Sequence, residues 1–242
     1  MKTTGNRILI TGGSSGIGLA LAKAFASAGN VVMACARNED NLKSAAFIVP
    51  NLKIFRCDIS KEDGRIALFE WANRIGGVNM LINNAGIQRK IDIQKDPVSK
   101  DEIYTNLIAP IALTSIFMPM LHSNAPSAII NIGSGLGFVP MSKFPIYSAT
   151  KAAMHSFSIS LRRQLNGSAI KVFEVIPPIV HDTNLKGQII ERSENSVSAD
   201  VVALATINSI SIDEYECAIG AAKKWSKGSR EETDRTFDFI NK

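Results

Sequence analysis

The sequence predicts a three-layer, doubly wound α/β fold with a mostly parallel sheet of seven strands. Short apolar, β-rich runs alternate with helical segments along most of the chain, and a glycine-rich loop joins the first run to the first helix. Parallel strands need a crossover connection, and the intervening helices supply it. The length of 242 residues suits a single domain covering residues 1–242.

Composition narrows the class of protein. Apolar residues make up 45% of the chain and charged residues 20%, enough for a sizeable core. The net charge is +5 and the basic residues are dispersed, so nucleic-acid binding is not indicated. This surplus of positive charge suits an anionic ligand, although a role in solubility explains it equally well. No run has the length and apolarity of a membrane span, and the N-terminus lacks a signal sequence, so we expect a cytoplasmic protein without a membrane partner. The three cysteines predict neither disulfides nor a metal site.

The first half of the chain alternates regularly between strand and helix. We expect strands at residues 7–11, 31–36, 52–57 and 78–83, and helices at residues 19–28, 38–47 and 61–75. Small residues follow the strands.

The second half of the chain continues this alternation of strands and helices up to residue 176 and then interrupts it. We expect helices at residues 100–121, 145–165, 199–209 and 230–242, and strands at residues 127–133, 170–176 and 215–220. Pro110 and Pro119 should kink or end the helix that contains them. Residues 178–198 have no clear period and predict a lid loop over the substrate.

The glycine loop is a candidate nucleotide site. Glycines permit a tight turn and a close approach to a pyrophosphate, and the helix that follows offers free N–H groups. The candidate residues are Gly12, Ser14, Ser15, Gly16, Ile17 and Gly18. The spacing is GxxxGxG, and glycine loops also occur as plain turns, so the strand before it and the helix after it decide for nucleotide binding.

The end of the second strand indicates which dinucleotide binds. Ala36, Arg37 and Asn38 follow one another there, without the carboxylate that holds the ribose of NAD. Arg37 offers a charged fork to the 2′-phosphate of NADP, although it also reads as a solvated surface residue. NADP is therefore preferred over NAD.

Polar side chains follow the fourth and fifth strands. Asn83 is expected to tie neighbouring strands together, and Gly86 to leave space for a ribose. Ser134 can donate its hydroxyl to a substrate carbonyl. A serine at this place is by itself most often a turn residue.

Tyr147 and Lys151 are four residues apart and share one helix face. We expect the ammonium of Lys151 to lower the pKa of the Tyr147 phenol toward neutral pH, where it can transfer a proton. Taken alone, the pair also fits an ordinary amphipathic helix.

Together these motifs resemble the short-chain dehydrogenase/reductase family, in its compact single-domain branch with a Rossmann fold. The resemblance covers residues 7–183 and rests on the glycine loop, the Asn83-Asn84-Ala85-Gly86 run, Asn106, Ser134 and the Tyr147/Lys151 pair. It implies an NAD(P)-dependent enzyme that transfers hydride between the nicotinamide and a carbonyl or secondary alcohol.

The resemblance also implies a role for each residue. Tyr147 would be the general acid or base, with Ser134 polarising the carbonyl. Lys151 would lower the phenol pKa and hold the nicotinamide ribose. Asn106 would anchor a water that leads to solvent, because Pro110 removes the helical partner of its carbonyl. Further cofactor contacts are implied for Asp58, Ile59, Asn84, Ala85, Gly86, Pro177, Ile179, Val180 and Thr183.

One departure from the family affects the nicotinamide pocket. Pro177-Pro178 stands where Pro-Gly is usual, and the His181-Asp182 segment beyond it is unplaced. We interpret His181 as a loop residue.

The substrate is expected to be a small carbonyl or alcohol of largely apolar character. The loop before Tyr147 carries Leu136, Phe138, Val139, Met141 and Phe144, which would form an apolar wall unless they pack into the core or a subunit contact. Arg89 and Lys90 would add an anionic end. The family resemblance further implies a homodimer or homotetramer formed through the helices at 100–121 and 145–165.

Two other functions fit the same fold. A non-catalytic dinucleotide sensor or scaffold would lack part of the proton-transfer set, which is complete here. A sugar-nucleotide epimerase would need a larger C-terminal domain than the residues after Ile176 provide.

Overall fold

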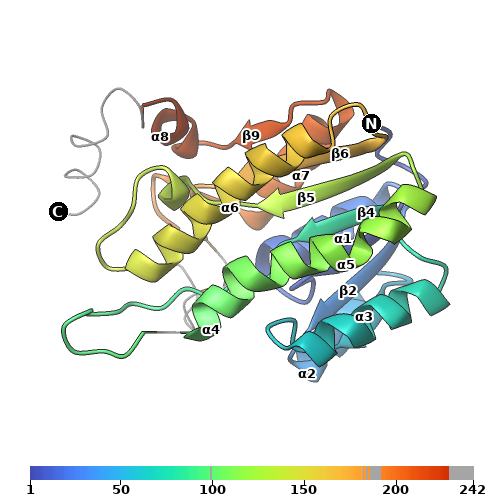
Figure 1. Cartoon of the computed structure of the whole chain (residues 1–242), viewed down its shortest axis with the longest axis horizontal. Helices are drawn as coiled ribbons and strands as arrows, with labels where there is room; N and C mark the ends of the chain where they lie inside the picture. Colours follow the sequence, from blue (N-terminus) through green and yellow to red (C-terminus); the bar gives the residue numbers. More distant parts are fainter. Residues whose placement is uncertain (99, 182, 184, 186–191, 229–242) are drawn as a thin grey trace.

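The computed structural model describes residues 1–98, 100–181, 183, 185 and 192–228. In this part of the chain a central sheet is covered on both faces by helices (Figure 1). The helix expected at 230–242 lies outside the described residues.

The sheet has seven strands in the order β3-β2-β1-β4-β5-β6-β9, and every pairing is parallel. The strands are β1 (Arg7–Thr11), β2 (Val31–Ala36), β3 (Lys53–Arg56), β4 (Met80–Asn83), β5 (Ser127–Ile132), β6 (Ile170–Ile176) and β9 (Glu216–Ala218). The predicted fold class is confirmed. The strand order reverses between β1 and β4, and ligands of such sheets bind outside the carboxyl ends of the strands at this point.

Each face of the sheet has its own core. Ile8 and Ile10 of β1 pack with one cluster, and Leu9 between them packs with the other, as the alternation of a strand requires. All three are fully buried, and burying such a side chain stabilises the fold by roughly 1.5–3 kcal/mol. The first cluster lies under α1 (Gly16–Ser27), α2 (Glu39–Ile48) and α7 (Ala199–Ser211), and the second under α3 (Glu62–Arg74), α5 (Ala109–Ser123) and α6 (Pro145–Gln164).

The helix expected at 100–121 consists of three pieces. α4 (Lys100–Ile103) leads into a π-helical turn, η1 (Tyr104–Ile108), and then into α5. The amide of Ala109 donates to the carbonyl of Tyr104, five residues back. Pro110 starts α5, where its missing N–H costs little, and Pro119 lies inside it.

This helical stretch changes one expectation about membranes. Residues 100–123 are long and apolar enough to cross a bilayer, with a mean hydropathy of 1.4 over a window of 18 residues, so the prediction that no such segment exists is wrong. Leu113, Phe117 and Leu121 of α5 are fully buried against the sheet, and this packing accounts for the apolar composition.

The ends of the predicted lid are held together. Ile179–Val180 (β7) pairs in parallel with Ser196–Val197 (β8) in a separate small sheet. Two further short helices are η2 (Gly135–Gly137) and α8 (Ala222–Gly228).

Candidate active site

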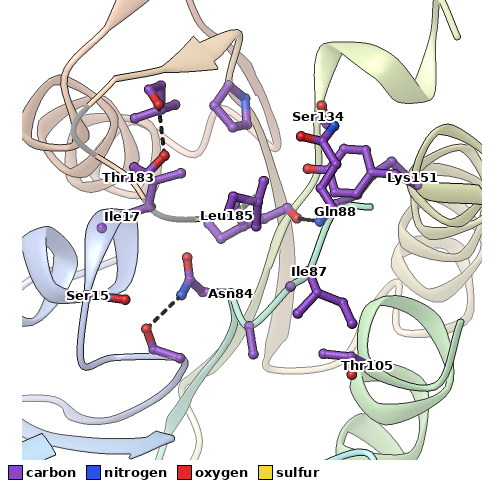
Figure 2. A pocket seen from close by; sticks show the side chains of 18 of the residues that line it. Ser15, Ile17, Asn84, Ile87, Gln88, Thr105, Ser134, Lys151, Thr183 and Leu185 are labelled. Carbon is purple, nitrogen blue, oxygen red and sulfur yellow. Dashed lines mark hydrogen bonds between the residues drawn. The ribbon is translucent and has the colours of Figure 1, made fainter. Parts of the chain in front are cut away.

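A cavity of about 340 Å³ opens over the carboxyl ends of the strands and brings most of the predicted residues together. In Figure 2, Ser15 and Ile17 of the glycine loop lie on one side, Ser134 and Lys151 on the other, and Asn84 between them. The predicted residues that line it are Gly12, Ser14, Ser15, Gly16, Ile17, Arg37, Asn38, Asp58, Ile59, Asn84, Ala85, Gly86, Ser134, Tyr147, Lys151, Pro177, Ile179, Val180 and Thr183. Gly18 and Asn106 are not among the lining residues.

The glycine loop is shaped by close approaches of the backbone. Gly12 and Gly16 have φ angles of +65° and +50°, a region that favours glycine. A Cβ on Gly18 would collide with the carbonyl of Gly12 and lie 2.6 Å from Nδ2 of Asn84. Gly18 therefore keeps the first turn of α1 against the loop and does not face the cavity.

Asparagines hold the ends of the central strands. Nδ2 of Asn83 donates to Oδ1 of Asn131 at 2.9 Å, which ties β4 to β5 as predicted. Nδ2 of Asn84 donates to the carbonyl of Thr11 at 2.8 Å, and the Thr11 hydroxyl accepts from the Asn84 amide. These side chains thus hold the backbone segments that form the cavity floor in place.

Arg37 is exposed at the far end of the cavity, after β2. Nε of Arg56 donates to the carbonyl of Arg37 at 3.2 Å, so a second guanidinium lies next to it. The side chain of Asn38 caps α2 by accepting from the amide of Asn41. This end therefore offers positive charge and no carboxylate among residues 36–38.

Tyr147 and Ser134 face each other at the other end. Tyr147 lies in the first turn of α6 and is buried, with 6% of its surface exposed. Burial raises the pKa of the phenol to about 12, and hydrogen bonding to Ser134 acts against this rise. The expectation that the pKa of Tyr147 would be lowered is therefore wrong for the protein alone, because burial outweighs the stabilising groups.

Lys151 lies one turn further along α6 and is also buried. Its Nζ donates to the carbonyl of Ile132 at 2.7 Å and lies 5.5 Å from the centre of the Tyr147 ring. Burial lowers the pKa of Lys151 to about 8, and the charge of Glu174 acts in the opposite direction.

Asn106 is placed by the π-helical turn beside the active site. Its side chain is 2% exposed and pairs with the backbone of Ile87, accepting from the amide at 2.9 Å and donating to the carbonyl at 2.8 Å. Its Nδ2 also lies 3.4 Å from the Thr150 hydroxyl. The side chain of Asn106 is therefore held against the backbone of Ile87, within a turn whose hydrogen bonding departs from that of a regular α-helix.

Both residues of the double proline line the cavity. The carbonyl of Pro177 accepts from the amide of Gly135 at 3.0 Å. Thr183 packs over the glycine loop, since a Cβ on Gly16 would lie 3.2 Å from its methyl group. His181 bonds to Ser196 at 2.9 Å and does not line the cavity, whereas Asp182 lies outside the described residues.

The predicted apolar wall is right for three of its five residues. Leu136, Met141 and Phe144 line the cavity, whereas Val139 is fully buried and the Phe138 ring contacts His155 in a tilted arrangement. Arg89 pairs with Asp101 at 3.5 Å, and neither Arg89 nor Lys90 lines the cavity.

Further residues line the cavity. Ala36 and Pro178 were named in the sequence only as neighbours of predicted contacts, and the others were not found there. These others are Cys35, Cys57, Ile87, Gln88, Thr105, Ile132, Gly133, Leu185 and Trp225. Most are apolar side chains with no chemical signature. Trp225 of α8 reaches the cavity from far along the chain and packs on Gly135, and no local pattern predicts this contact.

Comparison with known proteins gives a consistent result. The family model of the short chain dehydrogenases matches residues 6–194. An uncharacterized oxidoreductase, DltE of Bacillus subtilis, is 44% identical over 249 aligned residues, which cover 100% of this chain and 98% of DltE.

Solved structures agree in fold. A short-chain dehydrogenase of Sphingobium yanoikuyae in complex with NADPH is 26% identical, with a TM-score of 0.80 over 93% of this chain and 94% of that one. A short chain dehydrogenase/reductase of Burkholderia phymatum in complex with NAD is 19% identical, with a TM-score of 0.85 over 100% and 97% of the two chains.

Proposed function

The chain belongs to the short-chain dehydrogenase family of oxidoreductases, and from this premise we propose that it transfers hydride between NADP(H) and a carbonyl or secondary alcohol. One observation carries the proposal. The hydroxyls of Ser134 and Tyr147 and the ammonium of Lys151 lie in the same cavity as the glycine loop.

The residues of the cavity fit a dinucleotide. A Cβ on Gly12 would lie 3.0 Å from Ala85, and one on Gly16 would lie 3.2 Å from Thr183, so side chains at these two lining positions would fill the cradle of the loop. The N-terminus of α1 points its free amides at this cradle, where a pyrophosphate would be held. When bound, the nicotinamide supplies or accepts the hydride.

In the direction of reduction, Ser134, Tyr147 and Lys151 at the other end of the cavity stabilise the developing charge and supply the proton. Ser134 donates a hydrogen bond to the carbonyl oxygen and orients it. Tyr147, whose pKa of about 12 keeps it protonated at neutral pH, gives its proton to the oxygen as negative charge develops there. The cationic Lys151 then stabilises the phenolate that remains, and a water on the carbonyl of Asn106 returns a proton from solvent.

Arg37 supports NADP as the preferred cofactor. Arg56 beside it adds a second positive charge at the place where a 2′-phosphate would lie. Since one similar structure holds NADPH and another NAD, the preference rests on these two side chains.

The lining of the cavity favours a largely apolar substrate. Leu136, Met141, Phe144, Leu185 and Trp225 surround the space beside Ser134, and Gln88 adds a polar group. We expect medium-sized ketones or aldehydes to enter this space in preference to charged ones.

Exposed apolar residues on η1 and α6 support a homodimer or homotetramer. Apolar residues line a second, shallow pocket between η1 and α6, and Tyr104, Ile108 and Ile159 are exposed on these elements. Contact between copies of these helices would cover them, and we further propose that the assembly is cytoplasmic.

Parallel titrations with NADPH and NADH, followed by nicotinamide fluorescence, test the cofactor assignment. We expect NADPH to bind more tightly. Arg37→Ala should weaken NADPH binding by ~1.5–3 kcal/mol, the size of a charge-assisted hydrogen bond, and leave NADH binding unchanged. Arg163→Ala, which removes an exposed arginine of α6, is the matched control. An equal loss for both cofactors in Arg37→Ala would rule out recognition of the phosphate.

A further inference from the structure

Glu174 is a carboxylate buried in the sheet behind the active site. It lies on β6, its side chain is 1% exposed, and its register partners are Asn131 of β5 and Glu216 of β9. A buried carboxylate is costly unless charges or hydrogen bonds compensate it. Its partners therefore indicate what it does.

One oxygen of Glu174 is held by His155 of α6. Nδ1 of His155 lies 2.7 Å from Oε2, and this hydrogen bond raises the pKa of the imidazole. The His155 ring packs on Phe138, with 4.4 Å between the ring centres. The imidazole is thus fixed between an aromatic ring and the carboxylate.

The other oxygen of Glu174 lies under the backbone that binds Lys151. A Cβ on Gly133 would lie 2.7 Å from Oε1. The residue before Gly133 is Ile132, whose carbonyl accepts from Nζ of Lys151 at 2.7 Å. The carboxylate and the ammonium therefore approach adjacent residues of β5 and the loop after it, Ile132 and Gly133.

Lys151 has no carboxylate at ion-pair distance among the described residues. Tyr147, Lys151 and His155 follow one another at four-residue spacing on α6, so Glu174 lies beside a row that ends at the phenol. Burial favours the neutral amine of Lys151, and the charge of Glu174 opposes this effect.

We propose that Glu174, oriented by His155, is a positioning residue that keeps Lys151 cationic inside the buried site. The proposal rests on the function proposed above, in which a charged Lys151 stabilises the phenolate. Glu174 touches neither substrate nor cofactor in this account and acts through the lysine alone.

The other charged groups near this row are few. On the Lys151 side, Tyr147 and Glu174 are the titratable neighbours, and Glu102 of α4 acts on Tyr147. On the other side, Glu216 and Arg162 act on His155 with opposite signs.

The test measures the titration of Lys151 directly. Protein labelled with [¹³Cε]lysine is titrated by NMR, and the Lys151 signal is assigned with Lys151→Arg. In E174Q, which keeps the shape and removes the charge, we expect the midpoint of Lys151 to fall by about one pH unit. E216Q removes a neighbouring carboxylate that faces His155 from β9 and should leave the midpoint unchanged. An unchanged midpoint in E174Q, or an equal fall in both variants, would overturn the proposal.

A pair of variants at His155 gives a second test if E174Q does not fold. H155Q keeps a donor for Glu174 and should preserve the midpoint of Lys151. H155F removes the donor, so that the buried carboxyl takes up a proton, and should lower the midpoint as E174Q does. The same midpoint in H155Q and H155F would contradict the proposed role.

A kinetic readout separates this proposal from the function on which it rests. In E174Q the alkaline fall of carbonyl reduction should move to lower pH, while NADPH binding stays the same. A wild-type protein that reduces no carbonyl would overturn the proposed function and leave the NMR result to decide on Glu174.

Discussion

The proposed reaction depends on two ionisable side chains whose pKa values are shifted by burial. The phenol of Tyr147 is raised to about 12 and the amine of Lys151 is lowered to about 8. In this state the pair suits reduction, since the proton to be donated is in place on Tyr147 and the stabilising charge is in place on Lys151.

This arrangement predicts how reduction depends on pH. Lys151 is cationic below about pH 8 and loses its charge as the pH rises through that value. Tyr147 stays protonated over the same range. The rate of carbonyl reduction should therefore fall above about pH 8, as measured by kcat with saturating NADPH. A rate that stays level to pH 9.5 would show that the charge of Lys151 is not required.

The residues that the sequence revealed are those with a chemical signature. Glycines at a strand end, a tyrosine and a lysine four residues apart, and an arginine after β2 each have a physical reason to be where they are. Trp225 and Leu185 have none, because their place in the cavity depends on how distant segments pack. His155 and Glu174 were also missed, since only the fold brings α6 and β6 together.

At the scale of elements, the alternation of strands and helices was readable from the sequence. The seven strands of the main sheet and the helices α1, α2, α3, α6 and α7 occur where they were expected, with ends that differ by a few residues, whereas η2 and α8 were not predicted. The π-helical turn was not predicted, because a single extra residue in a turn leaves the apolar period nearly unchanged. The pairing of β7 with β8 was missed because two-residue strands carry no pattern.

The π-helical turn gives a prediction about proton supply. Pro110→Ala restores an amide four residues after Asn106, which can close the turn into a regular helix and occupy the Asn106 carbonyl. We expect kcat to fall by roughly tenfold, less than the ~10²–10⁴-fold contributed by a group in direct proton transfer, with cofactor affinity unchanged. Pro119→Ala, in the same helix but outside the turn, is the control. Identical kcat values in both variants would exclude a role for the open carbonyl.

At the scale of the whole molecule, the sheet brings the proposed cofactor-binding residues and the proposed proton-transfer residues to one edge. Parallel strands all present their carboxyl ends there, so that the glycine loop after β1, Arg37 after β2 and Ser134 after β5 meet although they are far apart in the chain. On the outside of the molecule, Tyr104 and Ile108 of η1 and Ile159 of α6 are large apolar side chains that remain exposed.

The proposed oligomer can be tested at these exposed residues. Light scattering after size-exclusion chromatography should give a mass that is a multiple of 26.1 kDa at micromolar concentration. Ile159→Lys, on the outer face of α6, should reduce the mass, whereas Ile66→Lys, an equally exposed isoleucine of α3, should not. A monomer of 26.1 kDa for the wild type would refute the proposed oligomer.

The most direct test of the central claim is the reduction of an apolar ketone or aldehyde by NADPH in the wild type and in Tyr147→Phe. The substitution removes one oxygen and keeps the ring. We expect the wild type to oxidise NADPH with a panel of such carbonyls, and the variant to lose at least about 10²-fold in kcat while binding NADPH equally well. Near-normal turnover in Tyr147→Phe would contradict the assignment of Tyr147 as the proton donor.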